Sequence, residues 1–356
     1  MRVNRQEFLD CLEKARRAMP NRSTLPTLKQ FLIKSGDRLE VTTSDLDWGV
    51  TVSIPCEGES TSFLATPLLL DVIKSLTDDV VELIPDTDSW SLTVKSSRGQ
   101  TVLNMMAADD YPKIPEVTGK SFVIDSKLLA DLVDLGGSCA VKNPTRPLCG
   151  AIYLHVQNGV LEMVSTDQFS LSLATSPIES EDVEIILSAD TLKEISRLMS
   201  GDVKITVSEN MAAFECGSTR CYSRLIDGKY YAYQTVIPKT FVSTITCDRK
   251  ELFQTVSRAS IVASDEDRAV RLIVNNGFTV KAGSGDKGRM EEAIDSQVEG
   301  DPVEVWLQHV YLSKALKGLT ADKVEIGISG SLAPMKVSGS DRGFFVIMPM
   351  STPKGV

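Results

Sequence analysis

Three aspartates at matching positions are the residues of this chain best suited to chemistry. Asp45, Asp167 and Asp286 each follow a small residue at the end of an alternating stretch, and Asp109 and Asp110 form a further acidic pair. Carboxylates can act as general acids or bases, so these residues could belong to a carboxylate-dependent hydrolase. A single active site does not need three equivalent copies, however, and an aspartate after a strand commonly caps a turn. We therefore favour turn capping over catalysis.

The other reactive residue types form no arrangement typical of a catalytic or metal site. The only two histidines, His155 and His309, lie far apart in the sequence and lack the spacing of metal ligands. The seven cysteines include no C-x-x-C pair, which disfavours a disulfide framework or a zinc ribbon and suits a reducing, cytoplasmic setting. Walker, G-x-S-x-G and HExxH motifs are absent, and the glycine-rich stretch Gly283-Ser284-Gly285 is a short turn, too brief for a phosphate loop. The sequence therefore gives little support to an enzyme.

Length and composition indicate a globular protein of two or three domains. The chain has 356 residues, a hydrophobic fraction of 42% and a net charge of −10. We find neither an apolar run long enough to cross a membrane nor a signal peptide. The acidic balance disfavours a protein that binds nucleic acid through a simple basic patch.

A threefold repeat organises the elements that carry the aspartates. Two alternating strands joined by a polar turn with glycine recur about 120 residues apart, which is typical of β-hairpins. The three turns are Ser35-Gly36, Asn158-Gly159 and Asn276-Gly277. The spacing predicts three equal domains, 1–119, 120–240 and 241–356.

Two helices are expected in each domain. Asn4 and Glu7 form a capping box ahead of an apolar face made by Phe8, Leu12, Ala15 and Met19. Thr66 is expected to cap the second helix, with Pro67 at its first position. The later helices are predicted at 125–138, 188–200, 247–261 and 308–319. Because short strands outnumber the helices, the predicted class is α+β with antiparallel sheets.

The expected helices carry slightly more basic than acidic residues, whereas the rest of the chain is strongly acidic. Basic residues on surface helices are common in ordinary globular proteins. With the threefold repeat, the same bias suits helices that line a hole for DNA and sheets that form an acidic outer surface.

Several short motifs in this order resemble bacterial DNA polymerase III β subunits, the β sliding clamp family. The motifs are R-S-T-L-P at 22–26, T-S-D-L at 43–46, A-A-D-D-Y-P at 107–112, T-R-P-L at 145–148, S-T-D-Q-F-S-L-S at 165–172, D-G-K-Y-Y-A-Y-Q-T-V-I-P at 227–238 and F-F-V-I-M-P-M at 344–350. Each motif alone is weak, but together they cover nearly the whole chain at the expected spacing.

The resemblance implies a processivity factor for DNA replication with no catalysis and no cofactor. Two copies of three clamp domains would form a head-to-tail homodimer, a six-domain ring around duplex DNA. Encircling explains how an acidic protein can serve DNA, because a ring needs few phosphate contacts. The implied protein partners are the DNA polymerase III α subunit, the clamp loader and repair proteins, which bind through short linear peptides.

The family pattern also implies contact residues. Seven basic residues would touch DNA phosphates without reading sequence: Arg22, Lys74, Lys127, Lys142, Arg146, Lys193 and Arg197. The apolar dimer contacts would be Val72, Leu76 and Leu103 against Ile261 and Val262, unless all five belong to the core. Thr101 stands where many relatives carry an aromatic residue, which predicts a weaker dimer.

A peptide pocket is implied between domains two and three. Its apolar wall would be Leu148, Thr166, Leu171, Val236, Val346, Met348, Pro349 and Met350. The rim departs from the family, because Gln168-Phe169-Ser170 replaces a usual Gly-His-Arg, Tyr231 replaces Pro and Thr235 replaces a frequent Arg. The chain also ends in Ser351-Thr352 and a four-residue extension, where Arg-Leu is common. We expect an intact apolar groove with altered specificity.

Two interpretations of the resemblance stay open. The chain could be a main replicative clamp, or a divergent paralogue or mobile-element copy that replaces a host clamp and prefers other partners. The sequence does not separate them.

Overall fold

The computed structural model describes residues 1–339 and 341–353 as two compact units. Unit 1 consists of residues 1–127 and 194–225, and unit 2 of residues 128–193 and the chain from 226 onward. The middle third of the sequence therefore contributes strands to both units. Within the C-terminal extension, residues 354–356 lie outside the described residues.

Unit 1 is built on one antiparallel sheet of twelve strands, in the order β1-β6-β7-β8-β5-β2-β3-β4-β16-β15-β14-β9. Its strands are β1 (Arg2–Asn4), β2 (Phe31–Ser35), β3 (Arg38–Ser44), β4 (Trp48–Pro55), β5 (Thr61–Ala65), β6 (Val80–Asp86), β7 (Ser91–Lys95), β8 (Gln100–Ala107), β9 (Lys120–Asp125), β14 (Asp202–Val207), β15 (Met211–Cys216) and β16 (Thr219–Arg224). The sheet continues from the first third of the sequence into the second because β4 pairs with β16, with Val52 opposite Thr219.

Unit 2 contains a nine-stranded sheet, β13-β10-β11-β12-β25-β24-β23-β17-β21, and a four-stranded sheet, β20-β19-β18-β22. The strands of the first are β10 (Ala151–Gln157), β11 (Val160–Thr166), β12 (Ser170–Pro177), β13 (Val183–Ser188), β17 (Ser243–Asp248), β21 (Ser296–Gly300), β23 (Lys323–Ile328), β24 (Met335–Ser338) and β25 (Gly343–Ile347). Those of the second are β18 (Ala269–Val274), β19 (Phe278–Ser284), β20 (Gly288–Ile294) and β22 (Val303–Gln308).

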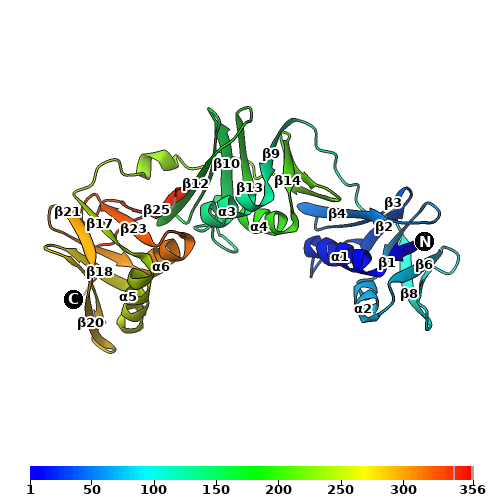
Figure 1. The fold of residues 1–356 in the computed structure, drawn as a ribbon, viewed down its shortest axis with the longest axis horizontal. Helices are drawn as coiled ribbons and strands as arrows, with labels where there is room; N and C mark the ends of the chain where they lie inside the picture. The colour runs from blue at the N-terminus through cyan, green and yellow to red at the C-terminus, as the bar shows by residue number, and fades with distance from the viewer. Residues whose placement is uncertain (340, 354–356) are drawn as a thin grey trace. The chain divides into compact units, whose positions relative to one another are not determined.

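The described residues form six α-helices (Figure 1), two in each third of the sequence, as predicted. They are α1 (Arg5–Ala15), α2 (Leu68–Ser75), α3 (Ser126–Gly136), α4 (Ala189–Leu198), α5 (Arg249–Val262) and α6 (His309–Gly318). The described residues also form four short 3₁₀ helices: η1 (Arg16–Ala18), η2 (Pro26–Lys29), η3 (Pro147–Gly150) and η4 (Tyr233–Val236). The predicted α+β class with antiparallel sheets is confirmed.

The first helix forms where its capping box and apolar spacing predict it. The Asn4 side chain accepts a hydrogen bond from the Glu7 N–H at 3.0 Å, which satisfies a free donor of the first turn. Phe8, Leu12 and Ala15 are fully buried, as the apolar spacing requires. The second capping prediction is wrong in detail, because Pro67 rather than Thr66 is the N-cap of α2. Thr66 contributes only its carbonyl, which accepts from the Leu69 N–H.

All three predicted hairpins are present, as β2–β3, β10–β11 and β18–β19. In the second, Asn158 and Gly159 have φ angles of 52° and 76°. This left-handed pair suits a two-residue turn between twisted strands, and it explains the Asn-Gly sequence.

Candidate functional site

A small apolar groove of about 190 Å³ lies in unit 2, where β12 and β25 run side by side. Leu171 of β12 is paired with Val346 of β25, and both are buried at its floor. The opposite wall comes from the chain around η4. The lining residues are Thr166, Gln168, Phe169, Ser170, Leu171, Tyr231, Ala232, Tyr233, Val236, Val346 and Met348. A groove of this size fits a few side chains rather than a whole cofactor.

Stacked aromatic rings hold the groove wall from behind. Tyr153 of β10 stacks on Tyr230 with ring centroids 5.0 Å apart and an angle of 5° between the rings. Tyr231 meets Tyr230 edge to face at 5.3 Å. Tyr230 also belongs to the buried core cluster that contains Leu171 and Val346. These ring contacts pack Tyr153, Tyr230 and Tyr231 together as one cluster behind the groove.

Tyr233 is fixed in this wall by a polar network. Its hydroxyl donates to Glu162 Oε2 at 2.5 Å and lies 2.7 Å from His155 Nε2. His155 Nε2 is also 2.9 Å from Glu162 Oε2. The hydrogen bond from His155 lowers the pKa of Glu162, whereas burial raises the pKa of Tyr233. An ionised Glu162 therefore holds the ring of Tyr233 in place.

The turn between β11 and β12 forms one rim of the groove. Asp167 Oδ1 accepts the backbone N–H groups of Phe169 at 3.0 Å and Ser170 at 2.6 Å. Asp45 makes the equivalent bonds to the N–H groups of Asp47 and Trp48 at 3.0 and 2.9 Å. The prediction that these two aspartates cap turns is confirmed. Asp286 lies in the exposed β19–β20 turn, where Ser284 Oγ accepts the N–H of Lys287 instead.

Helix α6 supports this rim from the C-terminal third of the sequence. Lys314 Nζ donates to Asp167 Oδ2 at 2.9 Å. Phe169 stacks on Tyr311 with ring centroids 6.1 Å apart. The backbone carbonyl of Phe169 accepts the Met348 N–H at 2.9 Å. Residues from both the middle and the C-terminal third of the sequence therefore hold the rim in place.

Eight of the eleven predicted pocket residues lie together in this groove: Thr166, Gln168, Phe169, Leu171, Tyr231, Val236, Val346 and Met348. Three do not line it. Leu148 packs against the core cluster, and Pro349 and Met350 follow the last strand without lining the groove. Met350 instead donates its N–H to the Trp306 carbonyl of β22.

Ser170, named in the sequence as part of the rim, also lines the groove, whereas the sequence interpretation missed two lining residues, Ala232 and Tyr233. Tyr233 lies inside the D-G-K-Y-Y-A-Y-Q motif, so a signal for it was present. Ala232 is a small residue whose only signal was its position beside the predicted rim residue Tyr231.

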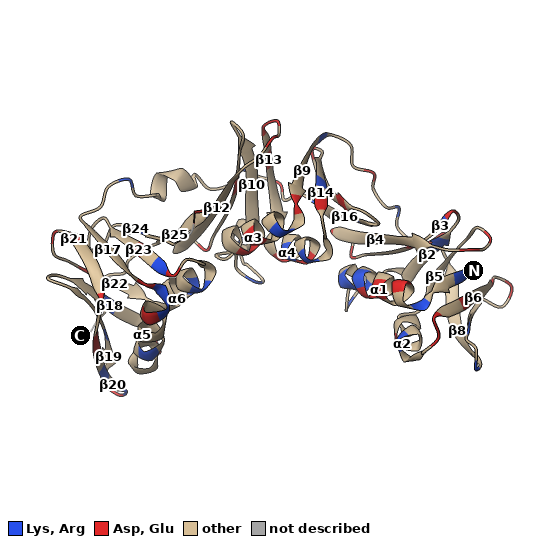
Figure 2. Ribbon diagram, viewed as in Figure 1, with Lys and Arg blue, Asp and Glu red and all other residues tan. Residues whose placement is uncertain are grey.

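Four of the basic residues predicted to touch DNA lie in unit 1. Arg22, Lys74, Lys127 and Arg197 are all exposed. Lys74 is 3.8 Å from Glu13, and Arg197 is 3.0 Å from Glu194. Figure 2 shows acidic residues interspersed with the basic ones on α1 and α4. Exposed ion pairs of this kind are weak, so these cations stay available to phosphates.

The other three, Lys142, Arg146 and Lys193, lie in unit 2. Lys142 is exposed in the loop before η3. Lys193 is partly buried and donates to the Gly137 carbonyl at 3.0 Å. Arg146 donates to Gln168 Oε1 at 2.9 Å. Arg146 therefore contacts Gln168, a residue that lines the groove, and its predicted contact with DNA stays a prediction.

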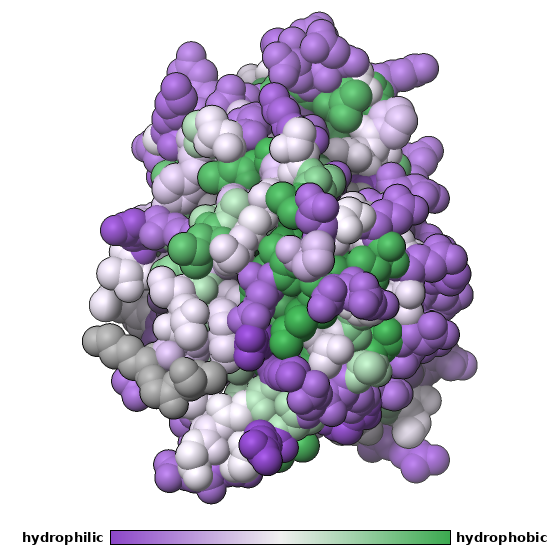
Figure 3. Space-filling view, turned by 90° about the vertical axis from the view of Figure 1, so that its left-hand side faces the viewer, coloured by the Kyte–Doolittle hydropathy of each residue, from purple (hydrophilic) through white to green (hydrophobic). Residues whose placement is uncertain are grey.

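The predicted dimer contacts are not all internal core. Ile261, near the end of α5, is 71% exposed. Its neighbour Val262 is half-buried, as are Val72, Leu76 and Leu103 of unit 1. Figure 3 shows a broken band of hydrophobic residues surrounded by hydrophilic ones on one end face. An isoleucine this exposed suits a surface that another chain covers.

Each unit also has a strand with an unpaired edge. In β8, residues 100–104 pair only with β7, so their other edge is free among the described strands. In unit 2, β20 is an edge strand of the four-stranded sheet. Thr101 lies on the free stretch of β8 and is exposed.

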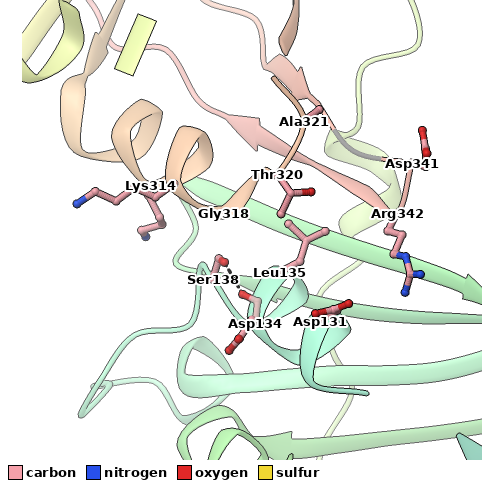
Figure 4. Close-up of a pocket in the computed structure, with 11 residues that line it drawn as sticks. Asp131, Asp134, Leu135, Ser138, Lys314, Gly318, Thr320, Ala321, Asp341 and Arg342 are labelled. Carbon is pink, nitrogen blue, oxygen red and sulfur yellow. Dashed lines mark hydrogen bonds between the residues drawn. The ribbon is translucent and has the colours of Figure 1, made fainter. Parts of the chain in front are cut away.

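A larger cleft of about 800 Å³ separates α3 from α6 in unit 2 (Figure 4). Asp131 and Asp134 line it from α3, and Lys314 and Lys317 from α6. Ser138 Oγ donates to the Asp134 carbonyl at 2.6 Å. Within residues 1–339 and 341–353, no group of three or more His, Cys, Asp or Glu side chains could hold a metal ion.

Other classes of site find no support in the described part of the chain. The hydrolase interpretation fails for Asp45 and Asp167, whose carboxylates bond to backbone N–H groups of their own turns. None of the described helices is long and apolar enough to cross a membrane. All seven cysteines are free thiols.

Comparison with known proteins places three consecutive family domains along the chain. Residues 1–115 match the N-terminal domain of the DNA polymerase III beta subunit, residues 123–231 its central domain and residues 234–351 its C-terminal domain. The beta sliding clamp of Pseudomonas putida is 28% identical over 98% of both chains. That of Synechococcus elongatus is 24% identical over 94% of both.

Solved structures show the same fold. The DNA polymerase sliding clamp of Bacillus subtilis superposes with a TM-score of 0.94 over 99% of both chains, at 23% identity. A Pseudomonas aeruginosa sliding clamp solved bound to griselimycin gives a TM-score of 0.93 over 99% of both chains, at 24% identity.

Proposed function

Because the chain belongs to the DNA polymerase III beta subunit family, we propose that it acts as a DNA sliding clamp. It encircles duplex DNA and tethers replication proteins to it, as a processivity factor and not an enzyme. The observation that carries this proposal is the ordered match of all three family domains along a chain with the clamp fold.

The clamp works as a ring of two subunits joined head to tail. Each subunit supplies three clamp domains, which we place at 1–119, 120–240 and 241–356. The exposed Ile261, together with Val262, supports a contact with Val72, Leu76 and Leu103 of a second copy. The free edge of β8 and the edge strand β20 suit backbone pairing across the same contact. Thr101 on that edge supports a weaker dimer than an aromatic residue would give.

Duplex DNA passes through the ring and is held by phosphate contacts alone. Seven exposed or partly exposed cations make these contacts: Arg22, Lys74, Lys127, Lys142, Arg146, Lys193 and Arg197. Few contacts suffice, since a closed ring cannot leave DNA sideways. Binding is therefore weak on linear DNA, independent of sequence and sensitive to salt.

The groove of unit 2 takes short linear peptides of partner proteins. Its partners are the DNA polymerase III α subunit, the clamp loader and repair proteins. Leu171, Val346 and Met348 offer an apolar floor for a Leu or Phe anchor, and methionine adapts to different side chains. The seven free cysteines support a cytoplasmic setting.

The rim favours a second version of the proposal, a divergent clamp with altered partner specificity. Gln168, Phe169 and Tyr231 all line the groove, and Phe169 is 58% exposed at its edge. A bulky exposed ring there changes which peptides fit, even where the floor is ordinary.

A processivity assay tests the proposed function. The protein is added to a circular primed template with a bacterial clamp loader and DNA polymerase III core, beside an ordinary clamp. We expect longer products per binding event than without the protein. Products of unchanged length, together with no retention on the template, would contradict clamp activity.

A further inference from the structure

Unit 1 contains a second copy of the turn that forms the groove rim in unit 2. The Ser44 hydroxyl accepts the Leu46 N–H at 3.0 Å, just as the Thr166 hydroxyl accepts the Gln168 N–H at 3.0 Å. Leu46 and Gln168 share a left-handed backbone conformation, with φ angles of 82° and 76°. The two turns therefore have the same local geometry, although one belongs to each unit.

The strands beside the two turns are paired in the same way. In unit 1 the pairing of β4 with β16 places Gly49 opposite Tyr222. In unit 2 the pairing of β12 with β25 places Leu171 opposite Val346. Gly49 and Leu171 follow their turns at the same distance along the chain. Because Leu171 and Val346 form the groove floor, Gly49 and Tyr222 occupy the equivalent place in unit 1.

The ring of Tyr222 fills that place. Tyr222 is only 7% exposed, and a Cβ atom on Gly49 would overlap its ring. Any side chain at position 49 would therefore displace the ring. The Tyr222 hydroxyl lies 2.6 Å from Ser44 Oγ, so a hydrogen bond ties the ring to the turn. Tyr222 thus occupies space that is open to a ligand in the groove of unit 2.

The rim beside Tyr222 is apolar where the rim in unit 2 is polar. Leu25 and Leu46 stand where unit 2 has Arg146 and Gln168, since Leu25 and Arg146 are the N-cap residues of η2 and η3. The two leucines are 44% and 42% exposed. A leucine in the left-handed conformation is strained, and strained residues cluster at ligand sites. The rim therefore keeps features of a ligand site although its floor is filled.

We propose that Tyr222 is a built-in plug of a second, latent binding site in unit 1, and that this site takes an aromatic ring when the plug is shortened. The ring of Tyr222 itself shows which group fits, because it lies against Gly49 and its hydroxyl bonds to Ser44. A phenol-like ligand makes the same contacts. This inference goes beyond the proposed function, since it involves no residue of the groove in unit 2.

Complementation with p-cresol, which has the structure of a tyrosine side chain, tests this proposal. Every protein compared is the full chain with Met348→Asp, which places a charge in the groove of unit 2 and prevents p-cresol from binding there. Tyr222→Ala removes the plug. At about ten times its dissociation constant, p-cresol should raise the thermal unfolding midpoint of this variant by about 2–4 °C, because it binds only the folded chain. The protein with Tyr222 intact should not respond.

Three further variants assign the effect to the site. Tyr222→Phe keeps the ring and loses only the bond to Ser44, so it should not respond to p-cresol. Tyr222→Val, which places at this position the residue type of Val346, is a second way to remove the plug and should respond like Tyr222→Ala. Calorimetric titration of Tyr222→Ala should show roughly three- to tenfold tighter binding of p-cresol than of toluene. Ser44→Ala added to Tyr222→Ala should abolish this preference, because the phenol hydroxyl loses its partner.

Each result supports or overturns the inference without bearing on the groove of unit 2. A folded Tyr222→Ala protein that does not bind p-cresol overturns it, because the space is then not a ligand site. Binding by the protein with Tyr222 intact overturns the role of Tyr222 as a plug. Toluene bound as tightly as p-cresol overturns the placement of the ligand beside Ser44. Failure of both Tyr222→Ala and Tyr222→Val to fold also overturns it, since the ring is then an essential part of the core.

Discussion

Ile261 provides the sharpest test of ring formation, because its exposure sets the size of the effect. Its side chain is 71% exposed in the single chain. Fully burying an isoleucine contributes roughly 1.5–3 kcal/mol, so covering the rest of Ile261 contributes about 1–2 kcal/mol per contact. A two-subunit ring has two identical contacts. Ile261→Ala should therefore weaken dimerisation by about 2–4 kcal/mol, or roughly 30- to 1,000-fold in the dissociation constant.

Sedimentation velocity across nanomolar to micromolar concentrations measures this change. Ile261→Asp should shift the protein further towards monomer, because a second copy would bury an unpaired carboxylate. Leu332→Ala is the matched control, since Leu332 is 64% exposed but lies between β23 and β24, outside the proposed contact. Equal effects of the alanine changes at Ile261 and Leu332 would refute the proposed interface. A wild-type protein that is monomeric throughout would refute a stable ring.

The remaining predictions concern DNA, the groove and its support. Arg22→Ala should reduce loading onto circular DNA without changing the thermal unfolding midpoint, because Arg22 is exposed; a lowered midpoint would mean a structural role. Met348→Asp should abolish peptide binding in a titration, since it places a charge in the apolar groove, and retained binding would mean that the groove lies elsewhere. Glu162→Gln should lower the free energy of unfolding by about 1 kcal/mol at neutral pH, where the bonds of ionised Glu162 to His155 and Tyr233 are fully present. The folded-state pKa of Glu162 lies below its usual 4.5, so wild-type stability from this group is lost as pH falls below that value. The difference between wild type and variant in denaturant unfolding should therefore shrink in acid, and a constant difference would contradict this role.

Local features of the fold were predictable from the sequence because they depend on neighbours along the chain. The capping box of Asn4 and Glu7 and the Asn158-Gly159 turn both form as expected. The pairing of β4 with β16 and of β12 with β25 was not predictable, because periodicity does not indicate which distant strands meet. Through these pairings, strands from different thirds of the sequence belong to one sheet. The two compact units therefore do not coincide with the three sequence repeats.

The groove was likewise predictable from the sequence only in part. Its floor followed from the resemblance, since Leu171, Val346 and Met348 match an apolar pattern. The contact between Arg146 and Gln168 did not, because it depends on two loop conformations and on a left-handed residue. The support of Tyr233 by Glu162 and His155 depends on side chains from three separate segments. The contacts that shape the groove therefore join residues that no single motif contains.

The most direct test of the clamp function measures retention on closed and opened DNA. Labelled protein is loaded onto a nicked circular duplex by a bacterial clamp loader, separated from free protein by gel filtration in high salt, and followed after one restriction cut. A clamp that encircles DNA should stay with the circle in high salt and leave within minutes of linearisation, because only topology holds it. Retention that is equal on circular and linear DNA, or no retention on either, would contradict encirclement.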